Sequence, residues 1–259
     1  MTVSQLYAFL DQRLSRALSA EWDNDGLACA PLPDKEVRRV LISLDASEAA
    51  VSRAIDGGFD VLLTHHPLLF RGVKELTPRT TVPRKLLRLA RADVAAMSFH
   101  TRLDAASGGV NDILAALLGL LEISPFAPEG EVPCGRIGRL ASPMRASAFA
   151  THVGKALSIP ALTLSGDADR LISTVAVLGG EGGDFVDAAM DAGADLFLSG
   201  RIGYHRALDA AEEGLVLIEA GHYATERPVC KRLAALVREA DPAHEVEIFD
   251  TPTVKAIRV

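Results

Sequence analysis

The sequence predicts an α/β protein made of two related lobes, each with a mostly parallel or mixed sheet flanked by helices. Short apolar segments alternate with helical segments along most of the 259 residues, which is typical of βαβ units. A helix–turn–strand motif occurs twice. The stretch Ile123–Pro133 between the two copies holds three prolines and little periodicity, so we expect the chain to cross there between the lobes.

The first half opens with a helix, because Thr2 and Gln5 have capping-box spacing and apolar residues follow on one face. Ser47 is a plausible N-cap for the next helix, which Gly57 and Gly58 would end. The expected strands here are Val37–Asp45, Phe59–His66 and Val94–Thr101, and the further helices are Ser47–Gly58, Pro83–Asp93 and Gly109–Leu120.

The second half repeats the alternation. The expected strands are Ile172–Gly180, Ala194–Gly200, Leu215–His222, Val246–Thr251 and Val254–Val259, and the expected helices are Arg145–Ser158, Asp184–Gly193, His205–Gly214 and Thr225–Ala240. We therefore expect one lobe of residues 1–125 plus 220–259 and a second of residues 126–219.

The repeated motif is AIDGGFDVLLTH from Ala54 and AMDAGADLFLSG from Ala189, 135 residues later. Helix–turn–strand units can look alike by chance, and the alternative is two related lobes. The first copy ends in His65 and His66, whereas the second has Gly200 and Arg201 there. Metal chemistry at this strand end would therefore belong to the first lobe.

The composition limits the class of protein. Hydrophobic residues make up 49% and charged residues 24%, as in a folded globular chain. The net charge of −7 argues against general binding of nucleic acid. No apolar run reaches the length of a membrane span, and no basic leader precedes an apolar core, so we expect a cytoplasmic protein. Three distant cysteines without a CxxC pair exclude a disulfide scaffold and a cysteine zinc finger.

Imidazoles and carboxylates follow three of the expected strands. His65 and His66 end one strand, and His100 and Asp104 leave the end of another. Ligands of open α/β sheets bind at the carboxyl ends of strands. A lone histidine there would be structural more often than not, but two in succession favour a ligand role.

The third group is His222 and Glu226, which are four residues apart where the closing helix begins. A solvated glutamate and a half-buried histidine are the ordinary alternative. Together the three strand ends offer nitrogen and carboxylate ligands without thiolate, which suit Zn, Mn, Fe, Co or Ni. Two carboxylates and several histidines suffice for two divalent ions with one bridging carboxylate.

Four strings in this order resemble a known family: WDNDGL from Trp22, THHPLLFRGVKEL from Thr64, HTRLDAASGGVND from His100 and GHYATE from Gly221. The chain is similar over nearly its whole length to the dinuclear-metal family labelled GTP cyclohydrolase 1 type 2, or NGG-interacting-factor-three-like. The resemblance implies a two-lobed α/β protomer, a toroidal homohexamer and a two-metal site between the lobes.

Residue by residue, the resemblance implies the metal ligands. His66 and Asp104 match ligands of one ion, His65 and His222 match ligands of the other, and Glu226 matches the bridging carboxylate. The resemblance places His100 in the cavity, as a proton carrier or a residue behind the ligands rather than a ligand.

Three positions depart from the family's usual pattern: Arg102 stands for Asn, Asp25 for a small apolar residue and Arg201 for an acidic residue. Arg102 lies between His100 and Asp104, so its planar fork of donors could bind an anionic substrate such as a nucleotide or phosphodiester. The alternative is a surface arginine, or one paired with an acid such as Asp25.

Two functions remain open on these grounds. The first is metal-dependent hydrolysis, cyclohydrolase-like or phosphoesterase-like, with His100 as the catalytic proton carrier. The second is a non-enzymatic metal-loaded hexamer that acts as scaffold, metal carrier or regulatory partner. The Gly-rich run Gly179–Phe185 lacks the lysine of a P-loop and is expected to be a loop into a helix, and no GxSxG elbow occurs.

Overall fold

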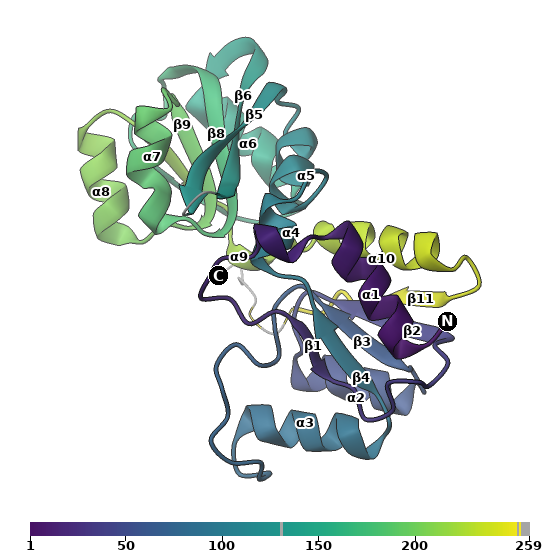
Figure 1. Cartoon of the computed structure of the whole chain (residues 1–259). Helices are drawn as coiled ribbons and strands as arrows, with labels where there is room; N and C mark the ends of the chain where they lie inside the picture. The colour runs from purple at the N-terminus through teal and green to yellow at the C-terminus, as the bar shows by residue number, and fades with distance from the viewer. Residues whose placement is uncertain (130–131, 253, 255–259) are drawn as a thin grey trace. The chain divides into compact units, whose positions relative to one another are not determined.

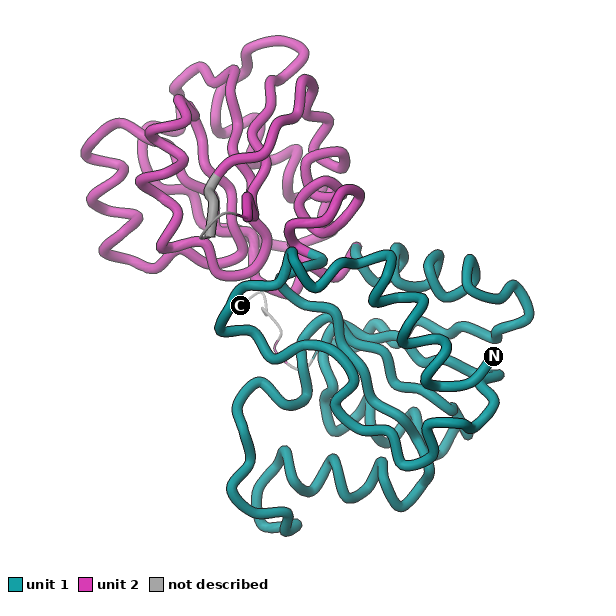
Figure 2. The backbone as a smooth tube through the Cα atoms, viewed as in Figure 1, with its two compact units in different colours: residues 1–103, 229–253 teal, residues 104–228, 254–259 magenta. Residues whose placement is uncertain are grey.

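The computed structural model describes residues 1–129, 132–252 and 254, which fold into two compact units (Figures 1 and 2). Of these, unit 1 contains the residues within 1–103 and 229–252, and unit 2 those within 104–228 and residue 254. The division thus falls after Leu103 and after Pro228, whereas we expected residues 104–125 and 220–228 in the first lobe. Each unit has one sheet flanked by helices, which confirms the predicted fold class.

Unit 1 holds a five-stranded sheet in the order β1-β4-β3-β2-β11, parallel except for β1. Its strands are β1 Gly26–Cys29, β2 Arg39–Ser43, β3 Val61–Thr64, β4 Ala95–Ser98 and β11 Glu245–Ile248. Its helices are α1 Val3–Arg13, α2 Glu48–Asp56, α3 Thr81–Arg91 and α10 Val229–Ala240, with the 3₁₀ turn η1 Arg16–Leu18. The short helix α4, Thr101–Ala105, leaves this unit.

The helices of unit 1 cover both faces of its sheet (Figure 1). Helices α2 and α3 pack on one face, where Leu41, Leu62 and Ala96 from adjacent strands meet apolar side chains of both helices. Helices α1 and α10 lie on the other face. The Thr2–Gln5 capping box of α1 and the Ser47 cap of α2 form as predicted.

Unit 2 holds a six-stranded sheet in the order β5-β6-β8-β9-β10-β7, of which β8, β9 and β10 are parallel. Its strands are β5 Leu121–Glu129, β6 Val132–Arg145, β7 Thr163–Ser165, β8 Leu171–Glu181, β9 Leu196–Arg201 and β10 Val216–Glu219. Its helices are α5 Val110–Leu117, α6 Ala146–Ala156, α7 Val186–Asp191, α8 Tyr204–Glu212 and α9 His222–Glu226, with the 3₁₀ turn η2 Gly183–Phe185. Helices α5 and α6 cover one face, and α7 and α8 cover the other.

The repeated motif is a structural repeat. Asp60 stands just before β3 and accepts two backbone N–H bonds of 2.8 and 2.9 Å from the segment that enters β2. Asp195 stands just before β9 and accepts two such bonds of 2.9 and 3.0 Å from β8. In both units the two strands pair in parallel, and the pairing register of β8–β9 repeats that of β2–β3. The two lobes are therefore built on the same helix–turn–strand unit.

Two predicted elements are wrong in detail. Most of the expected crossing at Ile123–Pro133 belongs to the antiparallel strands β5 and β6. Strand β5 lies at the edge of its sheet, where proline is tolerated because fewer backbone donors are needed. The expected closing helix Thr225–Ala240 is two helices, α9 and α10, because Pro228 cannot donate a helical hydrogen bond and restricts the residue before it. The expected strand Val254–Val259 lies outside the described residues, except Val254.

No helix among the described residues combines the length and apolar character that crossing a membrane requires.

Candidate metal centre

Three imidazoles gather at the carboxyl ends of β3 and β4 in unit 1. His65 and His66 follow β3 directly, and His100 is the second residue after β4. Each ring offers a nitrogen within 4.8 Å of a nitrogen of the other two, so the group could hold a metal ion. His65 is fully buried, whereas His66 and His100 are half-buried and reach solvent. The structure thus brings together three of the predicted residues.

Each of the three rings has Nδ1 beside an oxygen acceptor. His65 Nδ1 lies 2.9 Å from the Phe99 carbonyl oxygen, and His66 Nδ1 lies 2.7 Å from Asp45 Oδ1. His100 Nδ1 lies 3.0 Å from Asp23 Oδ1. A neutral imidazole that donates from Nδ1 carries its lone pair on Nε2, and metal-binding histidines in proteins are oriented in this way. In this tautomer each of the three rings has Nε2 available to bind a metal ion or to accept a proton.

Asp23 holds the start of the loop that carries His100. Its second oxygen accepts the backbone N–H of Thr101 at 3.0 Å and the Thr101 hydroxyl at 2.5 Å. Burial by itself would raise the pKa of the Asp23 carboxyl, but the hydrogen bonds from His100 and Thr101 lower it to about 2. The carboxylate is therefore ionised at neutral pH. Sequence reasoning missed this residue, although it lies in the WDNDGL string.

The anion-binding role expected for Arg102 is contradicted by its position. The side chain is fully buried. Its Nε and Nη2 donate to the two oxygens of Asp25 at 2.8 and 2.9 Å, and its Nη1 donates to Asp11 at 2.6 Å and to the Leu14 carbonyl at 2.8 Å. The alternative, pairing with Asp25, is what the structure shows. Two of the departures from the family pattern, Arg102 and Asp25, are thus partners.

This buried pair also supports the histidine group, since Asp25 Oδ2 accepts the backbone N–H of His100 at 3.0 Å. The pKa of the Arg102 guanidinium is raised, because the hydrogen bonds to Asp25 and Asp11 outweigh the opposing effect of burial. The cation therefore stays charged inside the unit, where it is hydrogen-bonded to the carboxylate that holds the His100 backbone.

In unit 2, His222 and Glu226 occupy the first and last positions of α9. Their side chains face each other as expected from the i, i+4 spacing, with His222 Nε2 3.0 Å from Glu226 Oε2. Glu226 is buried and His222 is largely exposed. Asp104, in α4, is half-buried, and its carbonyl oxygen accepts a bond of 3.3 Å from the buried Asn111.

Glycines at the ends of β8 and β9 make the space that α9 occupies. A Cβ at Gly180 would lie 2.2 Å from Glu226 Oε1 and 3.3 Å from His222 Nε2, and its φ of +73° disfavours other residues. A Cβ at Gly200 would lie 2.7 Å from the His222 Cα. Gly180 and Gly200, which we call the glycine seat, thus leave room for the candidate ligand pair His222 and Glu226. Gly180 belongs to the Gly-rich run that lacks a P-loop lysine. The tight spacing of glycines was the available signal, and its purpose could not be read from sequence.

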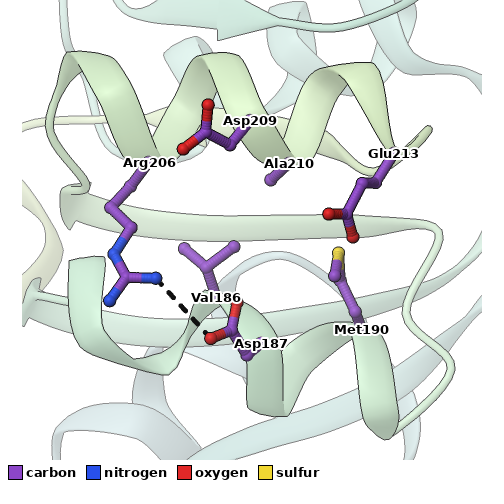
Figure 3. Close-up of a pocket in the computed structure, with 7 residues that line it drawn as sticks. All are labelled: Val186, Asp187, Met190, Arg206, Asp209, Ala210 and Glu213. Carbon is purple, nitrogen blue, oxygen red and sulfur yellow. Dashed lines mark ion pairs between the residues drawn. The ribbon is translucent and has the colours of Figure 1, made fainter.

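The third departure, Arg201, is largely exposed and pairs with Glu181 at 3.7 Å. A shallow pocket elsewhere in unit 2 lies between α7 and α8 (Figure 3). It encloses about 30 Å³, room for one or two water molecules. Its charged lining residues are Asp187, Arg206, Asp209 and Glu213. Such a hollow is too small for a substrate, so it does not compete with the histidine group as a functional site.

The sequence of residues 1–255 matches the family described as Duf34/NIF3 (NGG1p interacting factor 3). A protein of Streptomyces coelicolor named "GTP cyclohydrolase 1 type 2 homolog" is 34% identical over 250 residues, covering 93% of this chain and 87% of that protein. A protein of the same name from Nostoc sp. is 37% identical over 207 residues, 78% of each chain. The crystal structure of the Staphylococcus aureus hypothetical protein SA1388 is 27% identical, with a TM-score of 0.89 over 100% of this chain and 99% of that chain. This chain therefore belongs to the Duf34/NIF3 family.

Proposed function

We propose that this protein binds two divalent metal ions and is a metal-dependent hydrolase. The observation that carries the proposal is the group of His65, His66 and His100, each of which has Nδ1 beside an oxygen acceptor. Such orientation is typical of imidazoles that bind metal. The donors are nitrogen and carboxylate, which suit Zn, Mn, Fe, Co or Ni.

The proposed ligands are His65 and His66 of unit 1 and Asp104, His222 and Glu226 of unit 2. The glycine seat around Glu226 supports this assignment, because it makes room for a buried carboxylate at a strand end. Bound divalent ions would supply Lewis acidity and would lower the pKa of water toward neutrality.

His100 is the proposed proton carrier. Its Nδ1–H is directed to the ionised Asp23, so its Nε2 would accept a proton and release it again, with Asp23 holding the ring in place. Asp25 and Asp23, which accept the backbone N–H groups of His100 and Thr101, would keep this loop fixed during the transfer.

The substrate class is open between a cyclic C–N bond and a phosphoester. The relatives carry the name "GTP cyclohydrolase 1 type 2 homolog", which favours the cyclohydrolase-like reaction. With Arg102 buried against Asp25, no anionic substrate is implied by that residue.

A screen for activity tests the enzyme. Metal-loaded wild type, His66→Ala and His100→Ala would be assayed on nucleotides, cyclic amides and phosphodiesters, with His205→Ala on the exposed face of α8 as the matched control. We expect turnover of one substrate class that both site variants lose and the control keeps. Full metal occupancy without turnover on any substrate would instead support the non-enzymatic scaffold, metal carrier or regulatory partner.

We also propose a homohexamer that works in the cytoplasm. Exposed apolar side chains of unit 2, among them Leu171 and Leu121, are available for contacts between copies. Light scattering at micromolar concentration and neutral pH should give six times 27.5 kDa. A monomer under these conditions would contradict the assembly.

A further inference from the structure

Two large aromatic side chains stand beside the histidine group and remain open to solvent. Trp22 is 53% exposed and Phe70 is 47% exposed. Both belong to unit 1 but to distant parts of the chain, Trp22 before β1 and Phe70 after β3. Their ring centroids lie 5.8 Å apart at an interplanar angle of 66°. Two large aromatic rings in contact at the surface form a continuous apolar area, and continuous apolar area exposed on a protein often marks a binding site.

Both rings also contact His100. The Trp22 and His100 centroids are 6.1 Å apart at 72°, and those of Phe70 and His100 are 6.2 Å apart at 81°. These are edge-to-face arrangements, which aromatic rings prefer to face-to-face stacking. The two rings therefore flank the residue to which we assign proton transfer.

Polar contacts fix the loops that carry the two rings. Trp22 is followed by Asp23, whose carboxylate is fixed by His100 and Thr101. The Asn24 side-chain amide donates to the carbonyl of Leu69, the residue before Phe70. The loops that carry the two aromatic residues are thus tied to each other and to the histidine loop.

We propose that Trp22 and Phe70 form a binding surface for a planar heteroaromatic ring of nucleobase size and hold it beside His100. Stacking on exposed aromatic side chains is the general way in which proteins bind such rings without reading their edges. The inference names the substrate class of the proposed hydrolase site and so rests on that proposed function.

Trp22 is the only tryptophan of the chain, so its fluorescence reports on this surface alone. Metal-loaded full-length protein would be titrated with guanosine, adenosine and, as a non-aromatic control, ribose 5-phosphate, with excitation at the red edge of tryptophan absorption. We expect both nucleosides to quench Trp22 and ribose 5-phosphate to leave it unchanged. Equal quenching by the sugar phosphate, or none by either nucleoside, would overturn the proposal.

Substitutions of the aromatic residues test whether nucleosides bind at this surface. Phe70→Leu keeps apolar volume but removes one ring, and should weaken nucleoside binding by about 5- to 150-fold. Tyr204→Leu, at a 75% exposed aromatic residue of unit 2, should bind as wild type does. Calorimetry with Trp22→Leu provides a readout that does not need the fluorophore. If Phe70→Leu and Trp22→Leu bind nucleosides as tightly as wild type, the ring binds elsewhere and the proposal is wrong.

Metal content, measured on the same samples, separates this inference from the function on which it rests. Two bound ions without nucleoside binding would overturn the aromatic surface and leave the metal site standing. Nucleoside binding that depends on Phe70, in protein that takes up no metal on reconstitution, would support the surface and contradict the metal centre. Emission typical of a buried tryptophan, with no response to nucleosides in the assembled protein, would show that another copy of the chain covers Trp22, and would also overturn the proposal.

Discussion

Asp23 links the stability of the protein to pH. Its folded pKa of about 2 lies below the value of 3.8 for the free carboxyl. Between these values the unfolded chain binds a proton that the folded protein does not, so this contribution is present above about pH 3.8 and is lost as the pH falls toward 2. In metal-free protein it amounts to roughly 2 kcal/mol.

The comparison is urea unfolding of wild type and Asp23→Asn over a pH series. The free energy of unfolding of wild type should fall more steeply with acidification than that of the variant. If the two curves run parallel over this range, Asp23 is not held as the ionised partner of His100 and Thr101.

The buried pair of Arg102 and Asp25 predicts strong coupling between two substitutions. Arg102→Asn alone removes the two hydrogen bonds from the guanidinium to the buried Asp25 carboxylate and leaves that carboxylate beside the exposed Arg16 at 3.3 Å. It should destabilise the protein by about 3 kcal/mol. Asp25→Ala combined with Arg102→Asn follows the usual family pattern at both positions and should recover a large part of that loss. A double-mutant cycle by urea unfolding measures the coupling energy, and additive costs would refute it.

At these positions the sequence indicated which side chains lie close together within each unit, but not always what holds them. The adjacent histidines, His100 and the His222–Glu226 pair could be selected because strand ends and i, i+4 spacing constrain where side chains point. Arg102 was misjudged, because whether a guanidinium faces a site or the interior depends on acids from distant segments, here Asp11 and Asp25.

The close contact between Gly180 and α9 predicts that a larger residue at this position disturbs the helix. Gly180→Ala adds a methyl group where Glu226 Oε1 lies and should displace the side chains of α9, lowering metal affinity while unit 2 stays folded. Gly193→Ala is the matched control, because Gly193 has a similar φ of +77° with nothing within 4 Å of the added carbon. Metal titration of both variants measures the affinity, and circular dichroism checks that they remain folded. Equal metal affinity in the two alanine variants would mean that backbone strain, not contact with α9, is what Gly180 relieves.

Among the elements, the helices were predictable from their hydrophobic periodicity and the parallel strands from their short, continuous apolar runs. Asp60 and Asp195 occupy the same position in the two copies of the repeated motif. The sequence did not show that each carboxylate accepts backbone N–H bonds from the neighbouring strand or the segment that enters it. The hairpin of β5 and β6 was missed, because prolines at an edge strand have the same local pattern as a linker.

At the scale of the whole molecule, the two-lobed α/β architecture followed from alternation and from the internal repeat. The exact division of the chain did not, because it depends on which sheet α5 and α9 pack against, and both pack on unit 2. The proposed ligand set and the proposed hexamer rest on the family resemblance, because no periodicity encodes them.

Metal content tests the central claim most directly. Ligand imidazoles must be neutral to bind, and the free imidazole pKa is about 6.5. We expect elemental analysis of protein reconstituted at neutral pH to give about two ions per chain and steep loss on acidification below roughly pH 6.5. His66→Ala and Glu226→Ala should each lose at least one ion, and His205→Ala none. Fewer than one ion in wild type, or unchanged content in Glu226→Ala, would contradict the dinuclear centre.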